Sequence, residues 1–358
     1  MKVSFSSNIV EGPYGGGNTF LINLKQYLIE RNHLVVHDLK DRDIDIILLI
    51  NPLIESEHSN FNHIEILKYL KYKNQAAIVV QRFNECDERK NTKNVNKRLI
   101  EASKCSDYKV FVSKWLQELF ILKGLSNKNN KVILGGSNQN LFNNSNKKKW
   151  EQLNKLKFVT HHWSSNWMKG FEIYKKFDEL LEKKEFSDLF TLTYIGNLPK
   201  NFTFKNIEVL PPINQFELSL KLKEFDAYIT GSINEPSGNH HVEAGLTGLP
   251  ILYLKSGGVP EYCRDYGLEI DINNLEEKVY TLREQYDLYF EKMKYYRFTS
   301  EETNSEYLML FEYLLDNKDL IISKRKYNFY FLLIKWTSLH FLYLIRISFI
   351  KIFYKITN

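Results

Sequence analysis

The chain has 358 residues, of which 43% are hydrophobic and 26% are charged, a balance that excludes a disordered or fibrous protein and allows two globular domains. The net charge is +6, but seven basic residues and no acidic ones lie between positions 320 and 358. The rest of the chain is therefore nearly neutral, which argues against nucleic-acid binding. The three cysteines, Cys86, Cys105 and Cys263, lack the spacing of a disulfide framework or a thiolate zinc site and suit a reducing cytoplasm.

Short apolar runs alternate with helical patterns through the first part of the chain. Strands are expected at 3–7, 34–38, 44–50, 76–81, 109–113 and 131–135, with helices at 19–31 and 63–72. This alternation predicts βαβ units and a parallel sheet. Because most of these strands are apolar nearly throughout, the sheet is expected to be covered on both faces.

The alternation restarts after a lysine-rich stretch, 143–149, that we interpret as part of a solvated linker. Strands are expected at 157–161, 192–195, 207–210, 227–230 and 251–254, and helices at 170–181, 216–225, 241–248 and 274–296. The sequence thus predicts an α/β protein with two Rossmann-like, doubly wound domains that face a cleft. The predicted boundaries are 1–142, linker 143–155, second domain 156–300, a C-terminal helix 301–318 and a basic, amphipathic tail 319–358.

Two stretches in the first domain follow expected strands and so belong near that cleft. The glycine-rich stretch 11–19, with Gly16 and Gly17, would let the backbone approach a ligand, and the helix start after it offers N–H groups to phosphate. Its spacing departs from G-x-G-x-x-G, which counts against NAD, and a plain tight turn is the alternative. The polar cluster 82–90 either lines the cleft or caps a helix.

The most informative stretch is 235–250, E-P-S-G-N-H-H-V-E-A-G-L-T-G-L-P. Glu235 is expected in a loop after a strand and Glu243 one turn into a helix, with Asn239 as the N-cap. Free backbone N–H groups around 238–240 would then favour an anion. Two carboxylates and a helix start could address a sugar, a ribose and a phosphate together.

Glu235 and Glu243, with seven residues between them, resemble the E-x7-E motif of family 4 retaining glycosyltransferases of GT-B fold. The flanking E-P-x-G, E-A and G-L-P, together with S-G-G-V-P-E at 256–261, strengthen the likeness, which covers about residues 1–315. The resemblance implies a GT-B enzyme that transfers a sugar from a nucleotide-sugar donor to a hydroxyl acceptor, with retention and without a metal or cofactor.

The resemblance also implies roles for single residues. Glu235 and Lys169 would be the catalytic pair, Glu235 on the sugar hydroxyls and Lys169 on the diphosphate, although a solvated lysine in a first helical turn is the alternative for Lys169. The implied donor-binding residues are Glu243 (on the ribose), Gly238, Asn239, His240, Gly16, Gly17, His162 and Ser164. The implied acceptor-side residues are Arg82, Asn84, Asp87 and Arg89.

One position departs from the family pattern. The family usually has an arginine shortly before the lysine, whereas 161–166 reads H-H-W-S-S-N. A histidine, Ser164 or a remote arginine could take its place, and a purely structural role for either histidine is equally open.

The tail 327–354 is rich in aromatic and aliphatic residues interspersed with Lys335, Arg346 and Lys351, and its longest uncharged run, 336–345, is too short for a spanning helix. We expect it to bind a membrane surface, with a spanning segment, or docking on the protein itself or on a partner, as alternatives. With the resemblance, this predicts a cytoplasmic enzyme on the inner face of the cell membrane. Its acceptor is expected to be a saccharide, in particular a lipid-linked one, in cell-surface polysaccharide or lipopolysaccharide synthesis. A nucleotide-sugar epimerase of GT-B fold and a non-catalytic membrane-bound nucleotide-sugar-binding protein are the rival functions.

Overall fold

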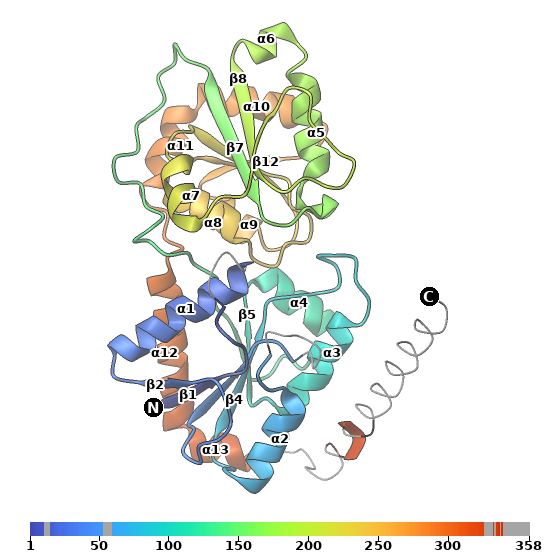
Figure 1. Ribbon diagram of the computed structural model, residues 1–358, viewed down its shortest axis with the longest axis vertical. Helices are drawn as coiled ribbons and strands as arrows, with labels where there is room; N and C mark the ends of the chain where they lie inside the picture. The colour runs from blue at the N-terminus through green and yellow to red at the C-terminus, as the bar shows by residue number, and fades with distance from the viewer. Residues whose placement is uncertain (11–14, 53–58, 326–331, 333, 337, 339–358) are drawn as a thin grey trace.

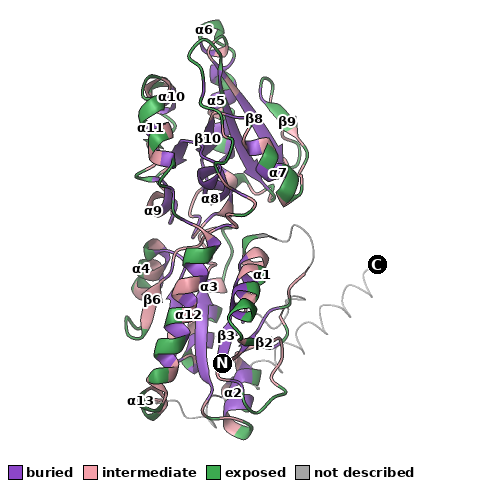
Figure 2. Cartoon of the chain, turned by 90° about the vertical axis from the view of Figure 1, so that its left-hand side faces the viewer, coloured by how far each residue is buried: buried purple, intermediate pink, exposed green. Residues whose placement is uncertain are grey.

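The computed structural model describes residues 1–10, 15–52, 59–325, 332, 334–336 and 338. Within these residues the chain forms two domains, one above the other in Figure 1, each with a six-stranded parallel sheet flanked by helices. The predicted α/β class, with two doubly wound domains, is confirmed. Figure 2 shows both sheets buried and the exposed residues concentrated on the outer faces of the helices.

The first sheet has the strand order β2-β1-β3-β4-β5-β6. Its strands are β1 (Lys2–Phe5), β2 (Leu34–Val36), β3 (Ile46–Leu49), β4 (Ile78–Phe83), β5 (Tyr108–Phe111) and β6 (Asn130–Val132). The helices between them are α1 (Gly15–Glu30), α2 (His63–Tyr72), α3 (Val95–Ala102), followed by the 3₁₀ turn η1 (Ser103–Cys105), and α4 (Lys114–Leu122). Alternate residues of β3 enter two different cores, Ile46 and Leu48 on one face and Ile47 and Leu49 on the other, which explains why this strand is apolar throughout.

The second sheet has the order β12-β11-β10-β7-β8-β9. Its strands are β7 (Leu156–His162), β8 (Phe190–Gly196), β9 (Glu208–Leu210), β10 (Ala227–Thr230), β11 (Ile251–Leu254) and β12 (Gly267–Ile270). Around it lie the turn η2 (Trp167–Lys169) and the helices α5 (Phe171–Leu180), α6 (Lys184–Ser187), α7 (Gln215–Leu222), α8 (Asn239–Leu246), α9 (Pro260–Cys263), α10 (Leu275–Glu284) and α11 (Tyr286–Met293).

The C-terminal helix α12 (Ser300–Asp316) returns to the first domain and packs beside α1 (Figure 1). Its Tyr307, Phe311 and Leu314 are buried in the core formed by β1, β3 and α1. The return is close to the outgoing chain, because the Ser300 amide donates to the Ser137 carbonyl at 2.7 Å. A Cβ on Gly136 would come within 2.0 Å of the Thr299 carbonyl oxygen, so this crossing requires glycine.

Contacts between the domains also involve the loop that leads into α9 and the first residues of that helix, at 256–261. The Glu261 carboxylate accepts hydrogen bonds from the backbone amides of Lys114 and Trp115, at 2.8 and 2.9 Å. A carboxylate of the second domain thus satisfies free N–H groups at the start of α4 in the first domain, where the helix dipole favours negative charge. This pairing gives the loop a structural role at the domain boundary.

One lysine of the expected linker is not solvated. Lys147 donates to the backbone carbonyls of Lys223, at 3.2 Å, and Phe225, just beyond α7, and burial lowers its pKa to about 8. Lys147 binds there because carbonyl groups at the C-terminal end of a helix lack hydrogen-bond donors within the helix, and a nearby ammonium group can donate to them. Lys148 and Lys149 are exposed, as expected.

The first part of the tail packs on the first domain. After α13 (Lys318–Ser323), the Arg325 guanidinium pairs with Asp107, and further on Trp336 is buried beside His63, with ring centroids 4.5 Å apart. Most of the segment 327–354, predicted to bind a membrane surface, lies outside the described residues. In the part of the chain that the structure describes, no helix is long and apolar enough to cross a membrane.

Candidate active site in the cleft between the domains

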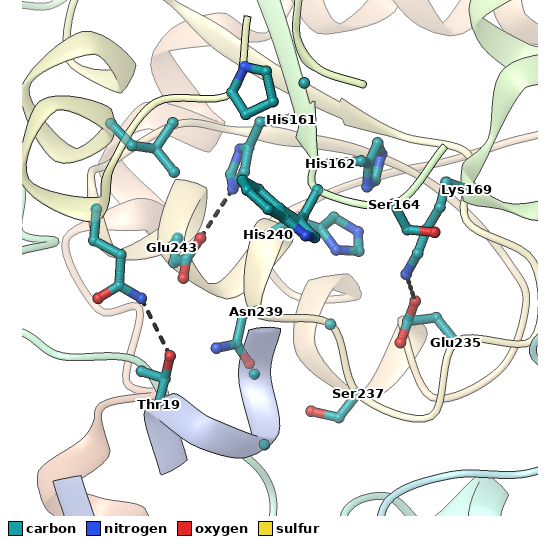
Figure 3. A pocket seen from close by; sticks show the side chains of 18 of the residues that line it. Thr19, His161, His162, Ser164, Lys169, Glu235, Ser237, Asn239, His240 and Glu243 are labelled. Atoms are coloured by element: carbon teal, nitrogen blue, oxygen red, sulfur yellow. Dashed lines mark hydrogen bonds and ion pairs between the residues drawn. The ribbon is translucent and has the colours of Figure 1, made fainter. Parts of the chain in front are cut away.

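A cavity of about 290 Å³ lies between the two domains, where the carboxyl ends of the strands of both sheets meet (Figure 3). All but one of the predicted site residues line it: Gly16, Gly17, Arg82, Asn84, Arg89, His162, Ser164, Lys169, Glu235, Gly238, Asn239, His240 and Glu243. The exception is Asp87. The structure therefore brings these predicted residues together around one cavity, and the geometry shows how they are arranged.

On the cavity wall, the buried carboxylate of Glu235 pairs with two cations. The Lys169 ammonium contacts Oε2, and the Nε of Arg89 lies 3.0 Å from Oε1 (Figure 3 shows the first pair). Lys169 is held in place by the turn η2 and by Gly170, whose φ of 107° and close approach to Gly231 exclude a side chain there. Arg89 comes from the first domain, in the loop after β4.

The charges of this triad are set by burial and by one another. Burial acts to raise the pKa of Glu235, but Lys169 and then Arg89 outweigh it, so the pKa of the carboxyl group lies below its usual value. Burial also lowers the pKa of Lys169, with Arg89 adding to the effect and Glu235 opposing it. An ionised Glu235 therefore faces the cavity between two cationic groups.

Glu243, on α8, is the second buried carboxylate of the cavity. Its Oε2 lies 2.9 Å from Nε2 of His161, the penultimate residue of β7 (Figure 3). The Nδ1 of the same ring lies 3.3 Å from the Tyr228 hydroxyl. Because both ring nitrogens have partners, the imidazole is fixed in orientation and holds Glu243 in turn.

His162 and His240 line the cavity, but each ring contacts a buried hydroxyl group of the second domain. The Nε2 of His162 lies 2.7 Å from the Tyr174 hydroxyl, and the Nε2 of His240 lies 2.9 Å from Oγ1 of Thr230. Burial, reinforced by neighbouring cationic and histidine groups, holds the pKa of both histidines well below its usual value. At neutral pH neither ring carries a positive charge, so neither replaces an arginine as a cation.

The helix start in this motif differs from the prediction. Gly238 occupies the N-cap position and Asn239 is the first helical residue, so Asn239 is not the N-cap. Its side chain instead reaches α1, since a Cβ on Gly16 would lie 2.7 Å from Oδ1 of Asn239. The starts of α1 and α8 therefore meet across the cavity (Figure 3), and Gly16 leaves the space that this contact needs.

Two predicted acceptor-side residues have clear structural contacts. Asp87 accepts hydrogen bonds from the amides of Val95 and Asn96 at the start of α3, at 2.9 and 3.0 Å, which is the helix-capping alternative. Arg82 is only 6% exposed and its guanidinium carbon lies 4.1 Å from the ring centre of Phe20.

A second cavity, of about 320 Å³, lies within the first domain and adjoins the first, because Gly17 and Asn84 line both. Its other polar lining includes Asn8, Glu85 and Lys90. The polar cluster after β4 thus contributes to two connected cavities, one of which belongs entirely to the first domain.

Several cavity residues were not predicted as site residues, namely Thr19, Trp163, Gln215 and Ser237, and His161 was considered only as one possible replacement for the missing arginine. Gln215 donates to the Thr19 hydroxyl at 3.2 Å, a contact between the domains that no pattern in the sequence indicates (Figure 3). His161 and Trp163 stand in the stretch 161–166, whose place after a strand was the available signal. Trp163 is 57% exposed, although its ring borders the cavity.

Among the described residues, no three histidine, cysteine or acidic side chains are grouped so that they could hold a metal ion.

No protein-family model matches this sequence, and no curated protein matches it either. Solved structures that resemble it include Anabaena HepE (Alr3699) in complex with UDP-glucose, with 14% identity, a TM-score of 0.65, and coverage of 88% of this chain and 100% of that one. Sucrose-phosphate synthase from Thermosynechococcus elongatus has 13% identity, a TM-score of 0.60, and coverage of 88% and 99%.

A glycosyltransferase from Rickettsia africae has 13% identity, a TM-score of 0.61, and coverage of 88% of this chain and 98% of its own. At such identities the likeness establishes the fold. The chain has the two-domain GT-B fold of these glycosyltransferases, as expected from the sequence.

Proposed function

We propose that the chain is a retaining glycosyltransferase, similar to family 4, that moves a sugar from a nucleotide-sugar donor to a hydroxyl group of a saccharide acceptor. The observation that carries the proposal is the placement of Glu235 and Glu243 on one cavity between the domains, with Lys169 paired to Glu235. The fold supports it, and the similar HepE was solved with UDP-glucose and with UDP and glucose.

In the proposed reaction the bond between the anomeric carbon and the diphosphate oxygen breaks, and its electron pair stays on that oxygen. The acceptor oxygen bonds to the anomeric carbon, and its proton passes to an oxygen of the departing diphosphate. Lys169 would stabilise the negative charge that develops on the diphosphate. Glu235 would orient the sugar hydroxyls, and its negative charge favours the oxocarbenium-like transition state.

Glu243 would accept hydrogen bonds from the two ribose hydroxyls, while His161 holds its carboxylate in place. We expect no metal or other cofactor to be needed, since Lys169 and the backbone N–H groups at the start of α8 can neutralise much of the diphosphate charge. The nucleotide-sugar is a co-substrate in this scheme. The cavity within the first domain is the proposed place for the acceptor.

Replacing Glu243 with alanine is expected to weaken nucleotide binding by about 10- to 100-fold, because hydrogen bonds to a charged group are worth about 1.5–3 kcal/mol. Calorimetric titration with UDP, GDP, ADP and CMP measures this and identifies the base. Glu284→Ala, which removes an exposed glutamate at the end of α10, is the control. A wild-type chain that binds none of these nucleotides or their sugar conjugates would contradict the proposed function.

We also propose that the enzyme is cytoplasmic and peripheral on the inner face of the cell membrane, with a lipid-linked saccharide acceptor in polysaccharide or lipopolysaccharide synthesis. The basic, acid-free composition of the tail supports this. Leu332 and Trp336 attach the start of that segment to the first domain, which also holds the proposed acceptor cavity.

Neutralising the tail in the full chain, with Arg346→Gln, Lys351→Gln and Lys355→Gln together, is expected to weaken binding to anionic vesicles by about 100-fold, at about 1 kcal/mol for each basic residue. Sedimentation with anionic and neutral vesicles measures it. The variant should also lose activity on a lipid-linked acceptor and keep it on a soluble analogue. Equal activity of the wild type on both acceptors would contradict a role for the membrane.

A further inference from the structure

The loop after β4 in the first domain reaches across the cleft to the loop that carries Glu235. Asn234 donates through Nδ2 to the Glu88 carbonyl at 3.3 Å, and Arg89 lies 3.0 Å from the Glu235 carboxylate. Glu85, in the same loop, also contacts this guanidinium: its Oε2 accepts a hydrogen bond from Nη1 of Arg89 at 3.0 Å. Because one carboxylate from each domain contacts it, the guanidinium has a fixed position on the part of the cavity wall that the first domain forms.

The local charges favour an anion at this point. Glu235 and Glu85 supply two negative charges, whereas Lys169, Arg89 and Lys90, which also contacts Glu85, supply three positive ones. A cluster with a positive excess on the wall of a cavity favours a ligand that brings negative charge. A guanidinium can bind two phosphate oxygens at once through its forked N–H groups.

The other cations of the cavity are less suited to this task. Among the described residues that line it, the basic side chains are Lys169, Arg82 and Arg89. Arg82 is nearly fully buried and lies over the Phe20 ring, and the buried histidines are neutral at pH 7. Arg89 is the one that shares a carboxylate with Lys169.

We propose that Arg89 is the second cation of the donor diphosphate, acting opposite Lys169 and supplied by the first domain. The inference rests on the proposed function and adds to it. When donor binds, Arg89 exchanges the Glu235 carboxylate for diphosphate oxygens, and Glu235 becomes free for the sugar hydroxyls. As the bond from the anomeric carbon to the diphosphate oxygen breaks, the electron pair moves to that oxygen, and both cations stabilise it.

This assignment links donor binding to the position of the domains. Lys169 and Arg89 belong to different domains, so a diphosphate held by both joins the two walls of the cavity. Closure of this kind excludes water from the reacting atoms and limits hydrolysis of the donor. A nucleoside without phosphates would not join the walls, which gives the proposal a direct test.

The test is calorimetric titration of the full-length protein with UDP, UMP and uridine. Arg89→Gln is expected to weaken UDP binding by about 10- to 100-fold and to leave uridine binding unchanged, because only the diphosphate contact is lost. Arg89→Lys keeps the charge, so its affinity for UDP should lie between that of the wild type and that of Arg89→Gln. This variant replaces Arg89→Gln in the test if the glutamine variant does not fold. Lys97→Gln is the matched control: it removes an exposed lysine of α3 that lines neither cavity, and this variant should bind all three ligands as the wild type does.

A double-mutant cycle with Glu235→Gln separates a contact with diphosphate from an effect through the carboxylate. We expect Arg89→Gln to weaken UDP binding in the Glu235→Gln background as well. Absence of an effect there, or UDP binding by Arg89→Gln equal to that of the wild type, overturns the inference while the proposed function stands. If the wild type binds none of UDP, GDP, ADP and CMP and none of their sugar conjugates, the proposed function itself fails, and the inference fails with it.

Discussion

Replacing Lys169 with alanine is expected to lower the rate of glycosyl transfer by about 10²- to 10³-fold, the usual cost of removing a group that stabilises developing charge. The loss should appear mainly in kcat, because the charge on the diphosphate is greatest as the glycosidic bond breaks. Lys169 is well placed for this effect, since its side chain is only 13% exposed, lines the cavity and pairs with Glu235. Initial rates of nucleoside diphosphate release, with donor and acceptor varied in turn, measure it.

The matched control is Lys175→Ala, which removes an exposed lysine of α5, on the helix that follows the same turn. Its ion pair with Glu179 lies on the surface, and such pairs contribute little to stability. Lys169→Ala also leaves Glu235 with Arg89 as its remaining partner in the triad, so thermal unfolding of each variant should accompany the kinetics. A folded Lys169→Ala variant with more than a tenth of the wild-type kcat would contradict the assigned role.

The arrangement of the sheets could be predicted because burial on both faces leaves a strong mark on the sequence. Residues of β3 and β4 enter cores on either side of the sheet, so both strands contain continuous apolar runs, which are typical of buried parallel strands. The short edge strand β12 was not predicted, since its four residues include glycine and the exposed Glu269. The expected single helix at 274–296 is two helices, α10 and α11, which meet at Gln285.

The convergence of the site residues could also be predicted, because the carboxyl ends of parallel strands lie at one edge of each sheet. The pairing of Arg89 with Glu235 could not. These residues are far apart in sequence and belong to different domains, and no local periodicity records how two domains face each other. The same holds for the position of Asn239: its residue type favours an N-cap, but contact with α1 at Gly16 places it one residue further into the helix.

The basic residues of the tail have two different roles, which the composition alone does not distinguish. Its basic residues without acidic neighbours predict attraction to an anionic surface, and that prediction still applies to the segment beyond the described residues. Arg325, however, is one of those basic residues and is 7% exposed, because Asp107 in the first domain neutralises it. Lys335 likewise pairs with Glu101, which also accepts from the Trp336 indole at 2.9 Å. Ion pairs with acidic residues distant in sequence therefore attach Arg325 and Lys335 to the first domain.

Replacing Arg325 with methionine is therefore expected to destabilise the first domain by about 3–5 kcal/mol, the cost of leaving one partner of a buried ion pair without the other. Two hydrogen bonds are lost from the guanidinium to Asp107, at 2.7 Å from Nε and 2.6 Å from Nη2, and the buried carboxylate then lacks its cation. Chemical denaturation, followed by fluorescence and by circular dichroism, measures the change.

The matched control is Arg31→Met, because Arg31 pairs with Glu301 at 3.1 Å on the surface, where a loss below about 1 kcal/mol is expected. Asp107→Asn combined with Arg325→Met should cost less than the sum of the two single changes, since the double variant has no unpaired buried charge. An equal loss for Arg325→Met and Arg31→Met would show that the tail contributes no more to stability than a surface ion pair does. The larger expected loss at Arg325 follows from the burial of its ion pair, to which the loss of its hydrogen bonds to the carbonyls of Gln75 and Ala77 adds.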